Sequence, residues 1–210
     1  GRLEGLPGPV HLIGSVKLAM GSLQFDGTQH PDRWRIDLAD LKLGRSRLSA
    51  RGALSRQSDA ASQLTVQGVV RPADLETLPW IHHRLLGSWD IDGEFAFQSR
   101  VTGSLHDWRQ LQAQGIVAAE TFTVEQVSGR LLRVEVDQDR GRLTARLVNA
   151  TVADGRLTGA LVLDRREIPH KWMLEADWMQ ANLAHLSEAI PAWKDRRMQG
   201  SLTMHMSLMQ

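Results

Sequence analysis

The sequence predicts a mainly β fold with short helices: an extended antiparallel twisted sheet, bent into an apolar groove and built from repeated strand-helix-strand units. Three observations predict it. Apolar and polar residues alternate along nearly the whole chain, turn-forming residues recur at short intervals, and one succession of elements occurs twice. Composition agrees, because 42% hydrophobic and 23% charged residues are typical of a folded globular chain.

Alternation with a period of two is the mark of a strand with one buried face, and it is clearest in the middle of the chain. There, apolar residues alternate with acidic and amide side chains between Trp89 and Gln98. Trp34, Ile36 and Leu38 show the same pattern. The candidate lining of the apolar face comprises Trp89, Ile91, Phe95, Phe97, Leu143, Leu147, Leu157, Leu161, Leu163, Leu202, Met204 and Met206.

Turn chemistry predicts that successive strands are antiparallel neighbours. Asp26-Gly27, Leu43-Gly44, Asp139-Arg140-Gly141 and Asp154-Gly155 supply residues that tolerate the positive φ of tight hairpins. The tripeptide Gly-Arg-Leu begins at Gly129, Gly141 and Gly155, a spacing that suits strands returning beside one another. A parallel sheet would need longer crossovers than these connections allow.

Two short helices, expected over residues 72–78 and 181–186, reveal an internal repeat. Each carries two leucines at i, i+3 and leads through a proline and a tryptophan to a strand opened by glycine. Leu75 and Leu183 lie 108 residues apart, and Gly93 and Gly200 lie 107 apart. We therefore expect repeat units over residues 1–105 and 106–210 in one continuous sheet, as a fragment of a longer chain.

Several function classes are disfavoured. A net charge of +1 provides no broad positive field that would attract the phosphate backbone of nucleic acid. The lack of cysteine excludes disulfides and thiolate metal sites. Apolar runs are far shorter than the roughly 18 residues that a membrane-spanning helix needs. The carboxylates Asp90, Asp92 and Glu94 are interpreted as a solvated strand face. His82 and His83 are adjacent and therefore poor co-ligands on a strand, whereas on a loop they could bind metal adventitiously. Ser104, His106 and Asp107 lie near one another in sequence, which does not provide the geometry of a catalytic site. We expect no enzyme activity, cofactor or metal.

The stretch from Val127 to Met206 resembles the AsmA-like family, which includes the larger TamB and YhdP. The resemblance is carried by residues 141–147, 150–159 and 161–164, by the strand and helix at 174–186, and by the connector from 101–105 to 111–115. It implies a periplasmic segment of an inner-membrane-anchored protein whose groove conducts phospholipid toward the outer membrane. Membrane contact would then lie in parts outside this fragment.

A wholly apolar sheet face has two physical readings. It can cover lipid acyl chains, because each exposed methylene costs roughly 0.8 kcal/mol, or it can be an ordinary core under a second layer. The alternative function is a structural or protein-interaction β array that captures strands at its edges and assists outer-membrane protein assembly. A structure in which the concave side is open would favour the groove.

Overall fold

A computed structural model of the chain describes residues 9–18, 21–56, 61–75, 90–104, 111–166, 170–189 and 198–210. The chain forms thirteen strands and two short helices within these ranges. The strands are β1 (Val10–Leu18), β2 (Gly21–Gln29), β3 (Arg33–Leu43), β4 (Ser46–Ser55), β5 (Ser62–Val70), β6 (Ile91–Gly93), β7 (Phe95–Gly103), β8 (Gln112–Val124), β9 (Val127–Asp139), β10 (Arg142–Val152), β11 (Gly155–Asp164), β12 (Lys171–Asn182) and β13 (Ser201–Met209). The helices are α1 (Pro72–Leu75) and α3 (Leu183–Ala189).

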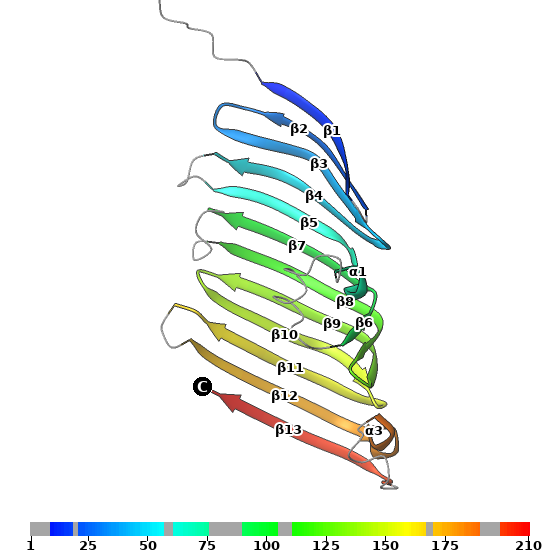
Figure 1. Cartoon of the computed structure of the whole chain (residues 1–210). Coiled ribbons are helices and arrows are strands. Elements are labelled where there is room, and N and C mark those ends of the chain that lie inside the picture. The colour runs from blue at the N-terminus through cyan, green and yellow to red at the C-terminus, as the bar shows by residue number, and fades with distance from the viewer. Residues whose placement is uncertain are drawn as a thin grey trace, which may run out of the picture.

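All thirteen strands belong to one open antiparallel sheet. Twelve follow one another in sequence order from β1 to β13, and the short β6 pairs with the end of β8 beside β7. The strands lie like rungs of a ladder, and both helices lie at the same end of the rungs (Figure 1). We call this end the helix-side rim. The mainly β architecture, the antiparallel order and the bent sheet predicted from the sequence are confirmed.

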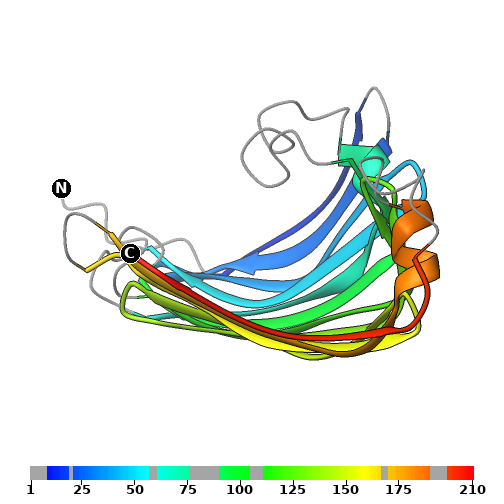
Figure 2. The same ribbon diagram turned by 90° about the horizontal axis from the view of Figure 1, so that it is seen from below.

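Seen along the ladder, the sheet is a trough whose strands turn sharply upward near the helix-side rim (Figure 2). β-bulges account for this bend, since an extra residue on one strand bends it and increases its twist. The register shifts after Leu147 in β10 and after Trp178 in β12. Leu131 in β9 and Gln180 in β12 each have φ 57°, which is rare for residues with a side chain.

The fully buried apolar side chains of the described chain all lie toward the helix-side rim. They are Leu43, Ala119, Ala150, Val152, Ala181 and Leu186. Five of them belong to strands, and Leu186 belongs to α3. The described residues therefore form a small core at the bend and a single layer in the rest of the sheet.

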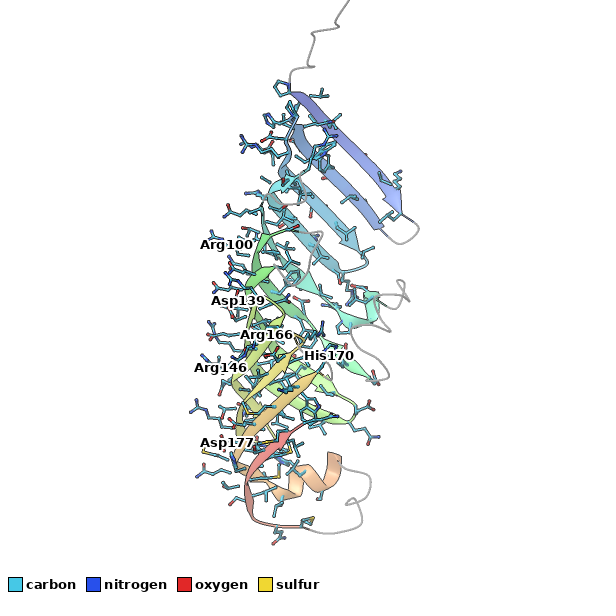
Figure 3. The ribbon with its side chains drawn as sticks, turned by 90° about the vertical axis from the view of Figure 1, so that its left-hand side faces the viewer. Arg100, Asp139, Arg146, Arg166, His170 and Asp177 are labelled. Carbon is cyan, nitrogen blue, oxygen red and sulfur yellow. The ribbon has the colours of Figure 1, made fainter. Side chains whose placement is uncertain are left out.

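The two faces of the sheet differ in polarity. Arg100, Arg146 and Asp177 project from the convex side (Figure 3). Cross-strand register places Arg100 opposite Gln114, and Arg146 opposite Glu135, so charged and amide residues follow one another on that side. Since side chains alternate between faces, the apolar residues between them point into the trough.

Three sequence expectations need correction. Asp26-Gly27 is no turn: both residues lie within β2, where the register with β3 shifts. Leu38 does not lie on the same face as Ile36, because a bulge between Ile36 and Ala39 places it opposite Asp26. The second helix begins at Leu183, since Ala181 still pairs with β13. The other three predicted turns connect β3 to β4, β9 to β10 and β10 to β11.

Asn182 explains where this helix starts. Its side-chain oxygen accepts a hydrogen bond from the backbone N–H of Ala184 at 3.0 Å, the pattern of an N-cap residue. For α1, Pro72 lies at the first position, as expected. The remainder of the first predicted helix, residues 76–78, lies outside the described residues.

The tight contact of Gly52 with the next strand gives a direct test of the sheet's geometry. A Cβ on Gly52 would collide with the carbonyl oxygen of Gln63, and its φ of 144° is a conformation that only glycine adopts easily. Gly52→Ala should lower the free energy of unfolding by about 1–3 kcal/mol, measured by urea denaturation.

Gly14 provides the matched control. It lies in β1, where an added Cβ would meet nothing within 4 Å. Gly14→Ala should change the free energy of unfolding by less than about 0.5 kcal/mol. Equal effects of the two substitutions would contradict the described approach of β4 to β5.

Candidate functional site

The candidate site is the concave face of the sheet, where apolar side chains form rows that cross every strand of the ladder. The central row is defined by direct cross-strand pairs and has no polar member. It runs Met206, Ala176, Gly159, Leu147, Val134, Val117, Phe97, Gly68, Leu48, Leu41, Leu23 and Val16.

Two further rows are also apolar, and both lie on the side of the central row that faces away from the helix-side rim. The row one step toward the opposite rim contains a single polar residue, Ser99, among Leu208, Leu174, Leu161, Ala145, Val136, Gly115, Val66, Ala50, Ala39, Phe25 and Gly14. In the next row, Gln138 is the single polar residue between Trp172 and Leu12. We call these three rows the apolar floor.

The structure brings the predicted lining residues together. Leu147, Phe97 and Met206 lie in the central row, and Leu161 lies in the row beside it. Leu143 pairs with Leu163 in the third row. Leu157 and Met204 both pair with Trp178, Leu202 pairs with Ala181, and Phe95 pairs with Val70. Ile91 is half-buried in β6, and Trp89 lies outside the described residues.

Sequence reasoning missed Trp172 and Trp178 and most of the N-terminal half of the floor, and it placed Trp34 on the apolar side of its strand without including it in the lining. Trp34, Trp172 and Trp178 share the face of Ile36, Leu174 and Leu157 respectively. The ring N–H of Trp172 donates to Gln210 Oε1 at 2.7 Å, and that of Trp178 donates to the Val152 carbonyl at 3.2 Å. The same alternation could have found them, and Leu48, Leu64 and Val66 as well.

The apolar floor is open within the part of the chain that the structure describes. Leu161 is 38% exposed and Leu208 45%, values far from those of core residues. Met204, which lies in the row next to the central row on the helix side, is 40% exposed. Most other floor residues are only half-buried. No described helix or strand lies over the centre of the trough, so the described residues supply no second layer of the kind that a sandwich has.

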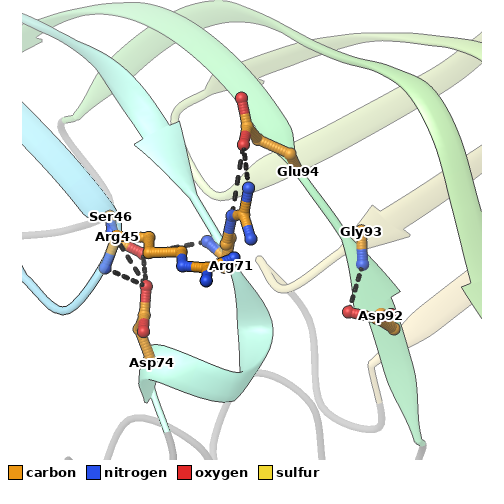
Figure 4. Close-up of polar contacts among 7 residues, drawn as sticks. All are labelled: Arg45, Ser46, Arg71, Asp74, Asp92, Gly93 and Glu94. Carbon is orange, nitrogen blue, oxygen red and sulfur yellow. Dashed lines mark hydrogen bonds and ion pairs between the residues drawn. The ribbon is translucent and has the colours of Figure 1, made fainter.

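A polar cluster secures the helix-side rim where α1 meets the β3–β4 turn (Figure 4). One carboxylate oxygen of Asp74 accepts hydrogen bonds from the Ser46 backbone N–H at 2.8 Å, the Ser46 hydroxyl at 2.7 Å and the Arg45 N–H at 3.1 Å. The hydroxyl of Ser46 in turn accepts from the N–H of Arg71, whose guanidinium pairs with Glu94 at 2.6 Å. These bonds lower the pKa of Asp74, with the Ser46 hydroxyl as the largest cause.

Two hollows are bounded mainly by polar residues. One of about 650 Å³ at the helix-side rim is bounded by Asp92, Arg130, Asp154 and His185. His185 and Asp154 are 2.8 Å apart there. The other, of about 550 Å³, lies among the polar side chains of the convex face, including Arg100 and Arg146. Neither hollow contains a predicted lining residue.

Several described polar groups of the candidate constellations make contacts within the chain. The carboxylate of Asp92 accepts from the Gly93 N–H at 2.8 Å, and Glu94 pairs with Arg71. On the convex face, the potential metal-binding atoms of His11, Asp26 and Asp37 lie within 4.8 Å of one another. His11 contacts Asp26 at 2.7 Å and Arg35 contacts Asp37 at 2.8 Å, so both carboxylates of this cluster already have a partner within the chain.

Ser104 is buried, whereas His82, His83, His106 and Asp107 lie outside the described residues. No described helix has the length and apolar character needed to cross a membrane.

No protein-family model, curated protein or solved structure matches the chain. The resemblance to the AsmA-like family therefore stays a prediction.

The Asp74 cluster predicts a pH-dependent contribution to stability. Because its pKa is lower in the folded chain than in the unfolded one, Asp74 stabilises the fold above about pH 4, and this stabilisation is lost as the pH falls through the folded pKa. Asp74→Asn should lower the free energy of unfolding by about 1–3 kcal/mol at pH 7. Urea denaturation at pH 7, 5 and 3 should show the difference shrinking only at the lowest pH.

Asp164→Asn is the control, because Asp164 is half-buried like Asp74 but pairs with Arg166 only two residues away. A pair this close in sequence can also form in the unfolded chain, so this substitution should change the free energy of unfolding less than Asp74→Asn at pH 7. A constant penalty for Asp74→Asn from pH 7 to 3 would contradict the role given to its charge.

Proposed function

We propose that the concave face binds the acyl chains of phospholipid and conducts them along the ladder. The observation that carries this proposal is the open apolar floor, which continues in register across twelve paired strands. An exposed apolar surface of this extent is rare in a protein unless it meets a partner, a ligand or lipid. The periplasmic location, the inner-membrane anchor and transport toward the outer membrane are part of the proposal and rest on the resemblance.

The energetics suit lipid passage through water. A chain of about a dozen methylenes that leaves water gains near 10 kcal/mol at roughly 0.8 kcal/mol per methylene. Twelve strands spaced about 4.8 Å apart span about 50 Å. Since a bilayer core of about 30 Å holds two acyl chains end to end, the floor is about three chains long.

The floor lacks the polar groups that would hold a lipid at one position. Ser99 and Gln138 are the polar residues of its three rows, and they lie on separate strands. An acyl chain shifted by one strand therefore meets nearly the same surface. Small free-energy differences between neighbouring positions favour sliding over storage.

A charge on the floor tests this function. Leu161→Arg should abolish most of the phospholipid that co-purifies with the chain, measured by lipid extraction and mass spectrometry, because an arginine among methylenes is poorly solvated. The control is Ala160→Arg, on the same strand but opposite Arg146 and Glu175 on the convex face. Ala160→Arg should retain the lipid. If neither wild-type chain nor control carries phospholipid, the proposal is wrong.

The lining tryptophans provide a second, direct test. In a variant that keeps Trp172 and Trp178 and has phenylalanine at the other five tryptophans, phospholipid brominated in its acyl chains should quench the fluorescence of both rings. Bromine quenches only at close contact, so quenching reports on the concave face. A lipid brominated only in its headgroup should quench much less, and equal quenching would argue against acyl chains in the groove.

The second candidate function is the capture of strands, as in the assembly of outer-membrane proteins. One observation favours it: every residue of β1 is exposed, including Val16 at 55%. Exposed edges of this kind accept strands from other chains. In that case Leu161→Arg should spare activity in a pull-down with assembly partners, which separates the two functions.

A further inference from the structure

We infer that the phosphate group of a bound phospholipid is held by cationic side chains at the rim opposite the helices, between β9 and β12. Because this location presupposes acyl chains on the apolar floor, it rests on the function proposed above. Three features of the rim carry it: its charge, its register with the floor, and the contrast with the helix-side rim.

Positively charged side chains gather where β9 turns into β10 and where β11 leads toward β12. Five exposed residues, which we call the cationic rim, lie there: Arg140, Arg142, Arg165, Arg166 and Lys171. The carboxylates of the same strand ends are Asp139 and Asp164, and Glu167 of the second loop lies outside the described residues. Five cations against three carboxylates leave a net charge of +2, which attracts an anionic group.

Both described carboxylates have neighbours within the chain. Asp164 accepts a hydrogen bond from Nε of Arg166 at 2.8 Å and another from the Arg166 backbone N–H at 3.0 Å. These bonds, the side-chain bond above all, hold the pKa of Asp164 well below its usual range. Asp139 accepts from the side-chain amide of Gln112 at 3.0 Å. Since Asp164 offsets the charge of Arg166, the excess positive charge lies with the other four members of the cationic rim.

Register places part of the cationic rim one row beyond the apolar floor. In β10, β11 and β12, the third row of the floor consists of Leu143, Leu163 and Trp172. Two positions nearer the rim, on the same side by alternation, are Gly141, Arg165 and His170. The N–H of Arg165 donates to the Gly141 carbonyl at 3.0 Å, so this register extends to the rim. His170 lies away from the convex side from which Arg100 and Arg146 project (Figure 3).

The helix-side rim has the opposite charge balance. Around β6 and the turns that follow β8 and β10, carboxylates outnumber arginines: Asp90, Asp92, Glu94, Glu125 and Asp154 against Arg71, Arg130 and Arg156. A phosphate is therefore attracted by one rim and repelled by the other. This asymmetry gives a bound phospholipid one orientation across the trough, with its head group away from the helices.

The dimensions of the floor suit this orientation. Successive rows on a strand are about 7 Å apart, so Arg165 lies about 20 Å from the central row. An extended acyl chain is about 15 Å long, half the thickness of a bilayer core. A lipid whose phosphate contacts Arg165 thus covers the two nearest rows before its chains turn along the ladder. Trp172 lies at this boundary between apolar and polar surface, a place typical of tryptophan beside membranes.

Phosphatidic acid and diacylglycerol with the same acyl chains test this site, because they differ only in the phosphate. The chain is given equal amounts of both, delivered from cyclodextrin, and its bound lipid is counted by mass spectrometry after re-isolation. The wild-type chain should carry roughly tenfold more phosphatidic acid, since arginine forms charge-assisted hydrogen bonds with phosphate. In the double variant Arg140→Gln, Arg165→Gln the ratio should fall to near one while diacylglycerol stays bound.

The matched control is Lys42→Gln, Arg47→Gln, which removes two positive charges at the helix-side end of β3 and β4 and should keep the wild-type ratio. Circular dichroism checks that both variants fold. Equal binding of the two lipids by the wild-type chain, or the same ratio in both variants, would overturn the head-group site and leave the acyl-chain function standing. No lipid of either kind would overturn both.

Inorganic phosphate separates a lipid head group from a free anion. Equilibrium dialysis against the lipid-free chain should show phosphate binding at least roughly 100-fold weaker than phosphatidic acid, because the acyl chains supply most of the affinity. Equal affinities would assign the cationic rim to the free anion and overturn the inference.

Discussion

The ladder of backbone hydrogen bonds between neighbouring strands is the interaction on which this structure depends. In most domains a sheet is also held by a layer packed on its face, whereas here the described layer is single and the fully buried residues gather at one rim. Each strand is therefore held chiefly by its two neighbours. Stability of this kind is close to a sum of nearest-neighbour terms, as in repeat proteins.

The bend and the small core depend on one another. Bulges near the helix-side rim turn the strand ends upward, and there Ala150 and Val152 become buried while residues farther along the same strand stay half-exposed. α3 adds Leu186 to this region. The rim thus provides the tertiary packing, and the floor of the trough is left free of packing partners among the described residues. An apolar surface can stay open for a ligand because the structure is secured elsewhere.

Sequence reasoning assigned residues to the correct face where alternation is regular. It was wrong where the pairing with a neighbouring strand decides the position of a residue. Leu157, Leu161 and Leu163 could be assigned to one face because β11 contains no irregularity that moves them to the other. Asp26-Gly27 resembles a hairpin turn in composition, and only its pairing with β3 shows that it lies within a strand. Ala181 suits a helix by propensity, yet it pairs with Leu202, so tertiary context overrides the local preference. The curvature has no local signal of its own, which is why alternation alone could not separate an open groove from a covered core.

The bulges nevertheless leave a trace in the sequence, and this trace bears on function. Concave residues normally recur every second position, but at three places the interval is three: Ile36 to Ala39, Leu147 to Ala150 and Trp178 to Ala181. Each interval coincides with a register shift. A shift of one residue would otherwise move every later side chain to the opposite face. Because the apolar pattern changes phase together with the backbone, the same face stays apolar on both sides of the bulge. Alternation is interrupted at these points while the continuity of the apolar surface is kept, and the lipid path that we propose would require that continuity.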